Sequence, residues 1–216
     1  GNLLVSIIND VLDLSKMDAN KIQINKSLVS PAGIVTDAIR LLQQDADKKG
    51  LELRQSELGP IPDKILTDGD KIKQILVNLL SNAIKFTEEG HVELQYHFIR
   101  SENLMHFKVR DMGTGIDPEF YDRLFEPFEQ EGGEKPGTGL GLAICQNLAH
   151  ALEGSLILES NNSNGATFSL TLPVDLSRLD PQPNQNREGP ITSFAQARIL
   201  IIDDDPDARN ILSHYV

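Results

Sequence analysis

Two neighbouring stretches of alternating sequence constrain the fold of this chain most strongly. Apolar and polar residues alternate through 91–98 and again through 105–111. A period of two predicts β-strands with one buried face. The inward apolar positions are Val92, Leu94, Tyr96, Phe98, Met105, Phe107 and Val109. The same parity puts the Asp111 carboxylate on the buried face at the end of its strand, where an unpaired charge would be costly.

Helical periodicity surrounds these strands. Ser30 and Pro31 predict a helix start and Gly50 its end. Asp68 predicts the N-cap of a second helix that runs to about Glu89-Gly90, with a continuous apolar face. That face comprises Ile72, Ile75, Leu76, Leu79, Leu80 and Ala83. Further helices are expected at 117–124 and 140–152, and strands near 51–53, 156–160 and 166–174.

Composition narrows the classes of function. The formal charge is -12, which disfavours a nucleic-acid surface, because such a surface needs clustered Lys and Arg. Cys145 is the single cysteine, so an intrachain disulfide is excluded and no zinc motif is present. A signal peptide and a long apolar run are both missing, so we expect this stretch to be cytoplasmic.

The ends of the chain predict further segments. Residues 1–18 have the apolar spacing of an amphipathic bundle helix, and the chain begins inside it, so we expect a piece of a longer protein. Residues 176–196 have the Pro- and Asn-containing composition of a linker. The sequence ARILIIDDD then predicts a new buried strand that ends in acidic residues. We therefore divide the chain into segments 1–20, 21–175, 176–196 and 197–216.

Three motifs carry candidate chemistry: NLLSNAIKF on a helix, DMGTG after a strand, and GTGLGLA at a helix start. Asn78 and Asn82 are four residues apart and Lys85 lies three further on, so all three share one helical face. Amide oxygens suit Mg²⁺, and amide or ammonium hydrogens suit phosphate oxygens. The glycines of the third motif, Gly137, Gly139 and Gly141, allow close backbone approach at a helix N-terminus that favours anions.

Asp111 adds recognition of a base. An inward carboxylate can accept a hydrogen bond from the exocyclic amine of adenine, whereas guanine presents a carbonyl in that place and would be repelled. Gly113 and Gly115 leave room for a planar base beside the backbone.

With these motifs in order, residues 1–175 resemble the catalytic domain of sensor histidine kinases, within the superfamily that includes gyrase, the ninety-kilodalton heat-shock chaperone and MutL. NLLSNAIKF is similar to the N box, DMGTG to the first glycine box, LFEPFEQ to the phenylalanine box and GTGLGLA to the second glycine box. The resemblance implies a two-layer α/β sandwich of the Bergerat type. In that fold, helices cover one face of a mixed sheet, and ATP lies under a lid at about 126–138.

The resemblance also assigns roles to residues. It implies that Asn78 binds Mg²⁺ with ATP, that Asn82 and Lys85 meet the phosphates, and that Asp111 holds adenine. Asn78 and Lys85 are the implied catalytic residues. The remaining implied nucleotide contacts are Gly113, Gly115, Ile116, Phe125, Gly137, Thr138, Gly139, Leu140, Gly141 and Leu142. Phe125 and Phe128 either anchor the lid or pack in the core.

Gyrase-like ATPases carry a Glu where this chain has Asn78. Because Asn cannot act as a general base, the resemblance favours phosphoryl transfer to a protein over ATP hydrolysis. A degenerate kinase that only binds nucleotide as a regulatory module is the alternative.

The phosphoacceptor is absent, because none of the five histidines lies in a His-Glu or His-Asp motif. Residues 1–18 resemble the end of a dimerisation helix, and the parent would be a homodimer that phosphorylates its own histidine. The tail resembles the start of a receiver domain, where Asp203 and Asp204 would help to bind Mg²⁺. The implied parent is a hybrid kinase with a receiver or response regulator as partner, attached to the bacterial inner membrane with this domain in the cytoplasm.

Overall fold

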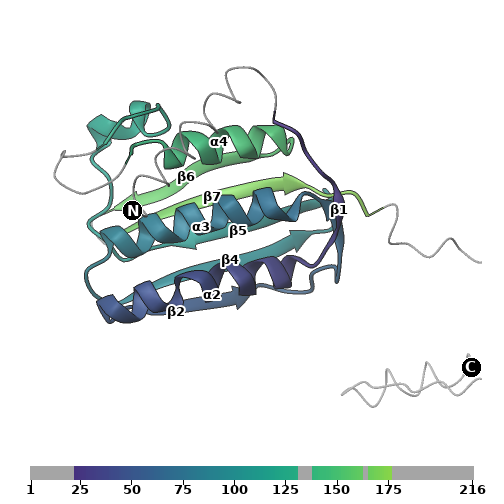
Figure 1. The fold of residues 1–216 in the computed structure, drawn as a ribbon, viewed down its shortest axis with the longest axis horizontal. Coiled ribbons are helices and arrows are strands. Elements are labelled where there is room, and N and C mark those ends of the chain that lie inside the picture. Colours follow the sequence, from purple (N-terminus) through teal and green to yellow (C-terminus); the bar gives the residue numbers. More distant parts are fainter. Residues whose placement is uncertain (1–21, 131–137, 163–164, 177–216) are drawn as a thin grey trace, which may run out of the picture. The chain divides into compact units, whose positions relative to one another are not determined.

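A mixed five-stranded sheet forms one layer of the structure, a computed structural model that describes residues 22–130, 138–162 and 165–176 (Figure 1). Its strand order is β2-β4-β5-β7-β6. The strands are β2 (Glu52–Glu57), β4 (His91–Ile99), β5 (Leu104–Arg110), β6 (Ser155–Asn162) and β7 (Gly165–Pro173). β2 pairs with β4 in parallel, and the other pairs are antiparallel.

Three helices form the second layer and cover one face of this sheet (Figure 1). They are α2 (Pro31–Lys49), α3 (Gly69–Phe86) and α4 (Gly141–Ala151). α2 contacts β2, α3 contacts β4 and β5, and α4 contacts β6 and β7. The predicted two-layer α/β sandwich with a mixed sheet is therefore confirmed.

The helix starts form as their caps predict. The Ser30 hydroxyl accepts a hydrogen bond from Gly33 N at 3.3 Å. The Asp68 carboxylate accepts one from Lys71 N at 3.1 Å and a second from Asn25 N at 2.9 Å. Gly50 ends α2 in the left-handed region at φ 71°, where glycine has no Cβ penalty.

The core lies between the layers and follows the predicted periodicities. All six predicted apolar positions of α3 are buried. The inward residues of β4 and β5 are also buried, except that Phe98 is half-buried. Among the described residues, no helix has the length and apolar character needed to cross a membrane.

The structure corrects some element boundaries. α3 ends at Phe86 instead of near Glu89, because Thr87 takes an extended conformation and caps Ala83 O. Strands β1 (Ser27–Val29) and β3 (Ile65–Thr67) form a small antiparallel sheet that the periodicity did not indicate. A 3₁₀ helix, η1 (Pro118–Arg123), occupies the predicted helical stretch near 117–124.

Several predicted segments lie outside the described residues: the helix at 1–18, the linker beyond residue 176 and the strand after residue 196. The chain separates into units 1–180 and 181–216. All residues of the second unit are outside the described residues.

Candidate functional site

The Asp111 carboxylate is buried where β5 ends. The residue is 8% exposed. Its Oδ1 accepts hydrogen bonds from Gly113 N at 2.8 Å and Ala166 N at 3.1 Å. Burial raises the pKa of the Asp111 carboxyl, and these two backbone hydrogen bonds oppose that rise. Among the described residues, the two amides that donate to this carboxylate both donate to Oδ1. Oδ2 can therefore accept a hydrogen bond from a ligand.

Close backbone packing explains the glycines beside Asp111. A Cβ on Gly113 would lie 2.7 Å from Phe86 O, and one on Gly115 would lie 2.4 Å from Asn162 O. Gly115 also has φ 77°. A side chain at either position would therefore collide with the protein's own backbone. The fold itself therefore requires glycine at both positions, in addition to any space that a bound base needs.

Asn161 fixes the segment that follows these glycines. Its Oδ1 accepts a hydrogen bond from Ile116 N at 2.8 Å, and its Nδ2 donates to Ile116 O at 2.7 Å. The same Nδ2 contacts the Tyr121 hydroxyl. The Asn161 side chain thus bridges β6 to the turn before η1. No sequence pattern indicated this role, because Asn161 is 45 residues away from Ile116.

Asn78 and Asn82 lie half-buried on α3 together with Lys85, as their spacing predicts. The Asn78 Nδ2 donates a hydrogen bond to Gly141 O at 3.3 Å, which joins α3 to the start of α4. A Cβ on Gly141 would lie 3.4 Å from Asn78 Oδ1. Lys85 Nζ lies 4.7 Å from the centroid of the Phe86 ring. The structure therefore brings the first and third motifs together.

Among the described residues, the N-terminus of α4 has no side-chain cap from its N-cap residue. Leu140 takes the N-cap position without a capping hydrogen bond, and no acidic residue lies in the first turn. Amides in the first turn of a helix lack intrahelical acceptors and carry the positive end of the helix dipole. The Leu140 amide, just before this turn, donates to Thr138 Oγ1 at 3.2 Å. This helix start suits a bound anion such as phosphate.

Three predicted contacts are largely parts of the core. Leu140 is only 1% exposed, and Ile116 and Leu142 are half-buried against the core. Their side chains therefore pack under the site, and any nucleotide contact by Leu140 would have to come from its backbone.

The two phenylalanines of LFEPFEQ differ. Phe125 packs against the core and meets the Phe168 ring edge-on, with centroids 6.5 Å apart. Phe128 is 65% exposed, with φ 68°. Its N donates to Gly139 O at 3.0 Å. A Cβ on Gly139 would lie 2.6 Å from the carbonyl carbon of Phe128, so the two described ends of the predicted lid segment are in contact.

Gly137, Asp203 and Asp204 lie outside the described residues.

The residues near Asn78 fit a magnesium ion carried by a nucleotide. In the described part of the chain, no cluster of three His, Cys, Asp or Glu residues could hold a metal ion. Mg²⁺ is commonly bound by one or two protein oxygens together with substrate phosphates. The Asn78 amide, beside an anion-favouring helix start, provides that kind of site.

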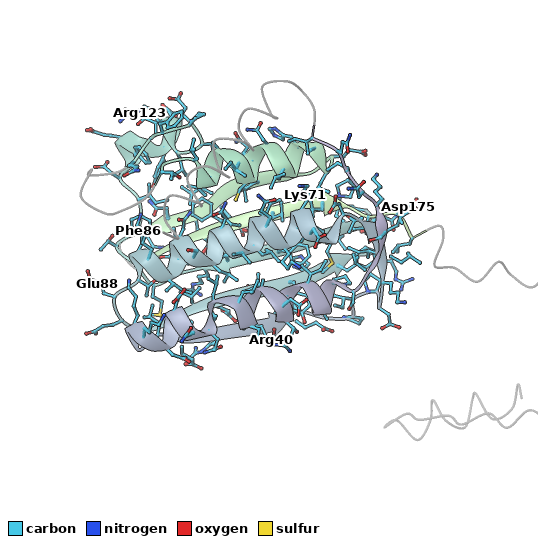
Figure 2. All side chains as sticks on the ribbon, viewed as in Figure 1. Arg40, Lys71, Phe86, Glu88, Arg123 and Asp175 are labelled. Atoms are coloured by element: carbon cyan, nitrogen blue, oxygen red, sulfur yellow. The ribbon has the colours of Figure 1, made fainter. Side chains whose placement is uncertain are left out.

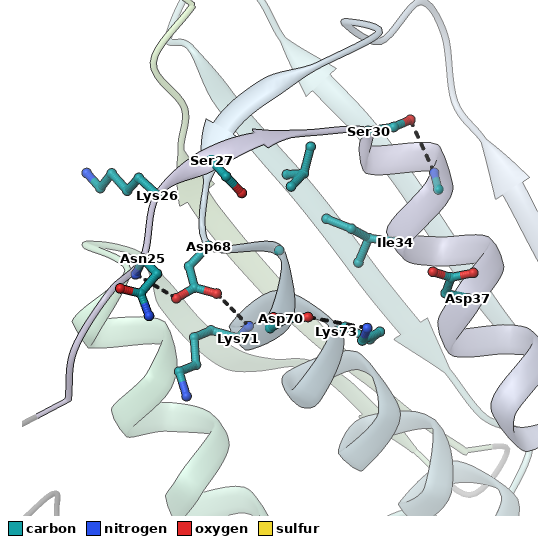
Figure 3. A pocket seen from close by; sticks show the side chains of 13 residues that line it. Asn25, Lys26, Ser27, Ser30, Ile34, Asp37, Asp68, Asp70, Lys71 and Lys73 are labelled. Atoms are coloured by element: carbon teal, nitrogen blue, oxygen red, sulfur yellow. Dashed lines mark hydrogen bonds and ion pairs between the residues drawn. The ribbon is translucent and has the colours of Figure 1, made fainter.

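A separate cavity of about 600 Å³ lies at the opposite end of α3, where that helix begins beside β1 and the start of α2 (Figure 3). Three lysines and three aspartates line it: Lys26, Lys71, Lys73, Asp37, Asp68 and Asp70. Figure 2 shows Lys71 at one end of α3 and Phe86 at the other end. This cavity contains none of the predicted nucleotide contacts.

Comparison with known proteins now defines the class. The profile of the family described as "Histidine kinase-, DNA gyrase B-, and HSP90-like ATPase" matches residues 67–176. That range holds Asn78, Asp111 and Gly141, which lie in the middle of α3, directly after β5 and at the first position of α4, respectively. The chain belongs to this family.

Individual relatives and one solved structure show which members of the family the chain is similar to. The chain is 36% identical over 174 residues to the aerobic respiration control sensor protein ArcB of Escherichia coli strain K12, covering 78% of this chain and 22% of ArcB. It is 37% identical over 221 residues to the autoinducer 2 sensor kinase/phosphatase LuxQ of Vibrio harveyi, covering 95% of this chain and 25% of LuxQ. The chain thus spans about a quarter of these relatives. The structure of full-length ShkA in complex with AMPPNP has TM-score 0.73 and 34% identity, covering 79% of this chain and 36% of ShkA.

Proposed function

We propose that this chain is the catalytic part of a sensor histidine kinase, which binds Mg-ATP and transfers the γ-phosphoryl group to a histidine. The observation that carries the proposal is the junction of α3 and α4, where Asn78 hydrogen-bonds Gly141 beside an uncapped helix start. The kinase named among the relatives and the adenine nucleotide analogue bound by ShkA support it.

Asp111 selects the base. Its Oδ1 is already held by two backbone amides, which fixes the direction of Oδ2. Oδ2 accepts the exocyclic amine of adenine, and a guanine carbonyl in the same place meets a negative charge.

Asn78, Asn82, Lys85 and the first amides of α4 orient the phosphates. The Asn78 amide oxygen would hold Mg²⁺, and that ion would supply neutralisation of the phosphate charge. Lys85 supplies a cation to the phosphate oxygens. Because Asn78 cannot take a proton from water, positioning of an external histidine decides the outcome of the reaction.

The acceptor histidine belongs to the dimerisation domain of the parent, of which residues 1–20 are the last part. The parent is a homodimer at the bacterial inner membrane, with residues 21–175 as its cytoplasmic catalytic domain. Residues 176–196 link this domain to a receiver that begins at residue 197, and that receiver or a separate response regulator takes the phosphoryl group. Nucleic acid is not a partner.

The test is phosphoryl transfer from γ-labelled Mg-ATP to a separately supplied dimerisation domain that carries the acceptor histidine. We expect acid-labile label on that histidine. A known active catalytic domain must label the same acceptor in parallel. ATP binding without transfer would instead establish the regulatory alternative, and steady phosphate release lost in Asn78→Ala would establish a hydrolytic ATPase.

A further inference from the structure

The last carbonyl groups of α3 find their hydrogen-bond donors outside the helix. An α-helix leaves its final carbonyls without intrahelical partners. Ala83 O accepts from Thr87 N at 3.0 Å and from Thr87 Oγ1 at 2.7 Å. The carbonyls of Ile84 and Lys85 accept hydrogen bonds from a side chain of another helix, that of Lys49.

Lys49 Nζ contacts three carbonyl oxygens at this terminus. It donates to Ile84 O at 2.8 Å, to Lys85 O at 2.8 Å and to Thr87 O at 3.1 Å. An ammonium group has three hydrogens, so these contacts use its full donor capacity. A cation at a helix C-terminus also interacts favourably with the helix dipole. Lys49 is exposed as a residue, but its charged end is engaged.

The backbone around Lys49 holds it in this place. Lys49 is the last residue of α2, and Gly50 N donates to Asp47 O while Leu51 N donates to Ala46 O, each at 3.0 Å. This double closure at a left-handed glycine fixes the end of a helix. The direction of the Lys49 side chain therefore follows from the end of α2.

The end of α3 touches the candidate base site. Gly113 lies so close to Phe86 O that a Cβ there would be 2.7 Å from that oxygen and 3.1 Å from Asp111 Oδ1. Lys85 belongs to the same turn. Figure 2 shows Phe86 at this end of the helix. Any displacement of the turn would move the backbone against which Gly113 and Asp111 are packed.

We propose that Lys49 is a positioning residue for ATP binding, which acts by fixing the last turn of α3 under Lys85 and against the Asp111–Gly113 turn. The inference rests on the proposed function, because it concerns the same nucleotide site. Lys49 itself touches protein carbonyls and acts on the nucleotide through Lys85 and Gly113.

The test compares Lys49→Met with Lys48→Met in the 216-residue chain. Both changes remove one positive charge. Among the described residues, the interaction of the Lys48 side chain is an exposed i,i+3 pair with Asp45, at 2.9 Å, so Lys48 is the matched control. We expect Lys49→Met to bind Mg-ATP about tenfold more weakly in calorimetry, and Lys48→Met to bind like the wild type. Backbone amide NMR signals of Lys85 and Gly113 should shift in Lys49→Met, while those of Gly33 and Leu156 stay unchanged.

Each outcome decides the inference. Wild-type affinity in Lys49→Met would overturn it, and so would an equal loss in Lys48→Met, which would indicate a general effect of charge. Shifts spread through Gly33 and Leu156 would indicate loss of the fold and would also overturn it. If the wild-type chain bound no ATP, the proposed function itself would fail, and the inference would fall with it.

Discussion

At the scale of single residues, Asp111 carries a charge in a place that disfavours it. Burial raises the pKa of its carboxyl, so the ionised form costs folding free energy. Two backbone amides offset part of this cost through Oδ1. Asp111 is the proposed contact for the base, and substitution separates that role from a contribution to stability.

Asp111→Asn should reduce function without reducing stability. The amide oxygen can still accept the hydrogen bonds from Gly113 and Ala166, but a donor replaces the second acceptor. We expect ATP affinity in calorimetry to fall about ten- to a hundredfold, with an unchanged or higher melting temperature. Asp117→Asn, at the exposed start of η1, is the control. Unchanged ATP affinity in Asp111→Asn would remove Asp111 from the site.

The same pKa shift predicts a dependence of stability on pH. The folded chain holds the Asp111 proton more tightly than the unfolded chain does, since its folded pKa is the higher of the two. The free energy of unfolding of the wild type, relative to Asp111→Asn, should therefore fall as pH rises from about 4. Urea unfolding at a series of pH values measures this difference. A difference that grows with pH would contradict the assigned direction.

At the scale of elements, long periodic segments were predictable and short ones were not. α2 and α3 carry full apolar faces and clear caps at Ser30 and Asp68, and both formed as expected. β1 and β3 have three residues each, too few to show a period. The end of α3 was misplaced because Thr87 adopts an extended conformation that the apolar periodicity did not indicate. The roles of Lys49 and Asn161 depend on contacts between distant segments, which periodicity cannot reveal.

The connection from β6 to the turn before η1 yields a prediction. Asn161→Ala removes both hydrogen bonds to Ile116 and the contact with Tyr121. We expect a loss of about 1–3 kcal/mol in the free energy of unfolding, measured by urea unfolding. Ser160→Ala, at an exposed neighbouring position, should cost much less. Equal costs would show that the Asn161 bridge contributes little.

The buried thiol of Cys145 can report whether helix α4 is packed on the core. Burial raises the pKa of this thiol to about 12, and a hydrogen bond with the Asn78 side chain opposes part of the rise. At pH 8 only about one thiol in ten thousand would then be ionised. We expect iodoacetamide to leave the folded chain unmodified over a time that fully alkylates the urea-unfolded chain. Rapid alkylation of the folded chain, followed by mass spectrometry, would show that α4 is not held on the core as described.

At the scale of the whole described domain, α3 joins two separate regions. Its C-terminal half carries Asn78, Asn82 and Lys85 toward Asp111 and α4, while its N-terminus borders the cavity beside β1 (Figure 3). The sheet holds Asp111 at the end of β5, and the helix layer carries the proposed phosphate contacts. In the proposed site, the base and the phosphates would thus be bound by different layers of the sandwich.

The most direct measurement is a calorimetric titration of the wild-type chain with ATP and with GTP, each with Mg²⁺. Selection by Asp111 predicts saturable 1:1 binding of ATP and affinity for GTP lower by about a hundredfold. Equal affinity for the two nucleotides, or no binding of ATP, would contradict the account of this site.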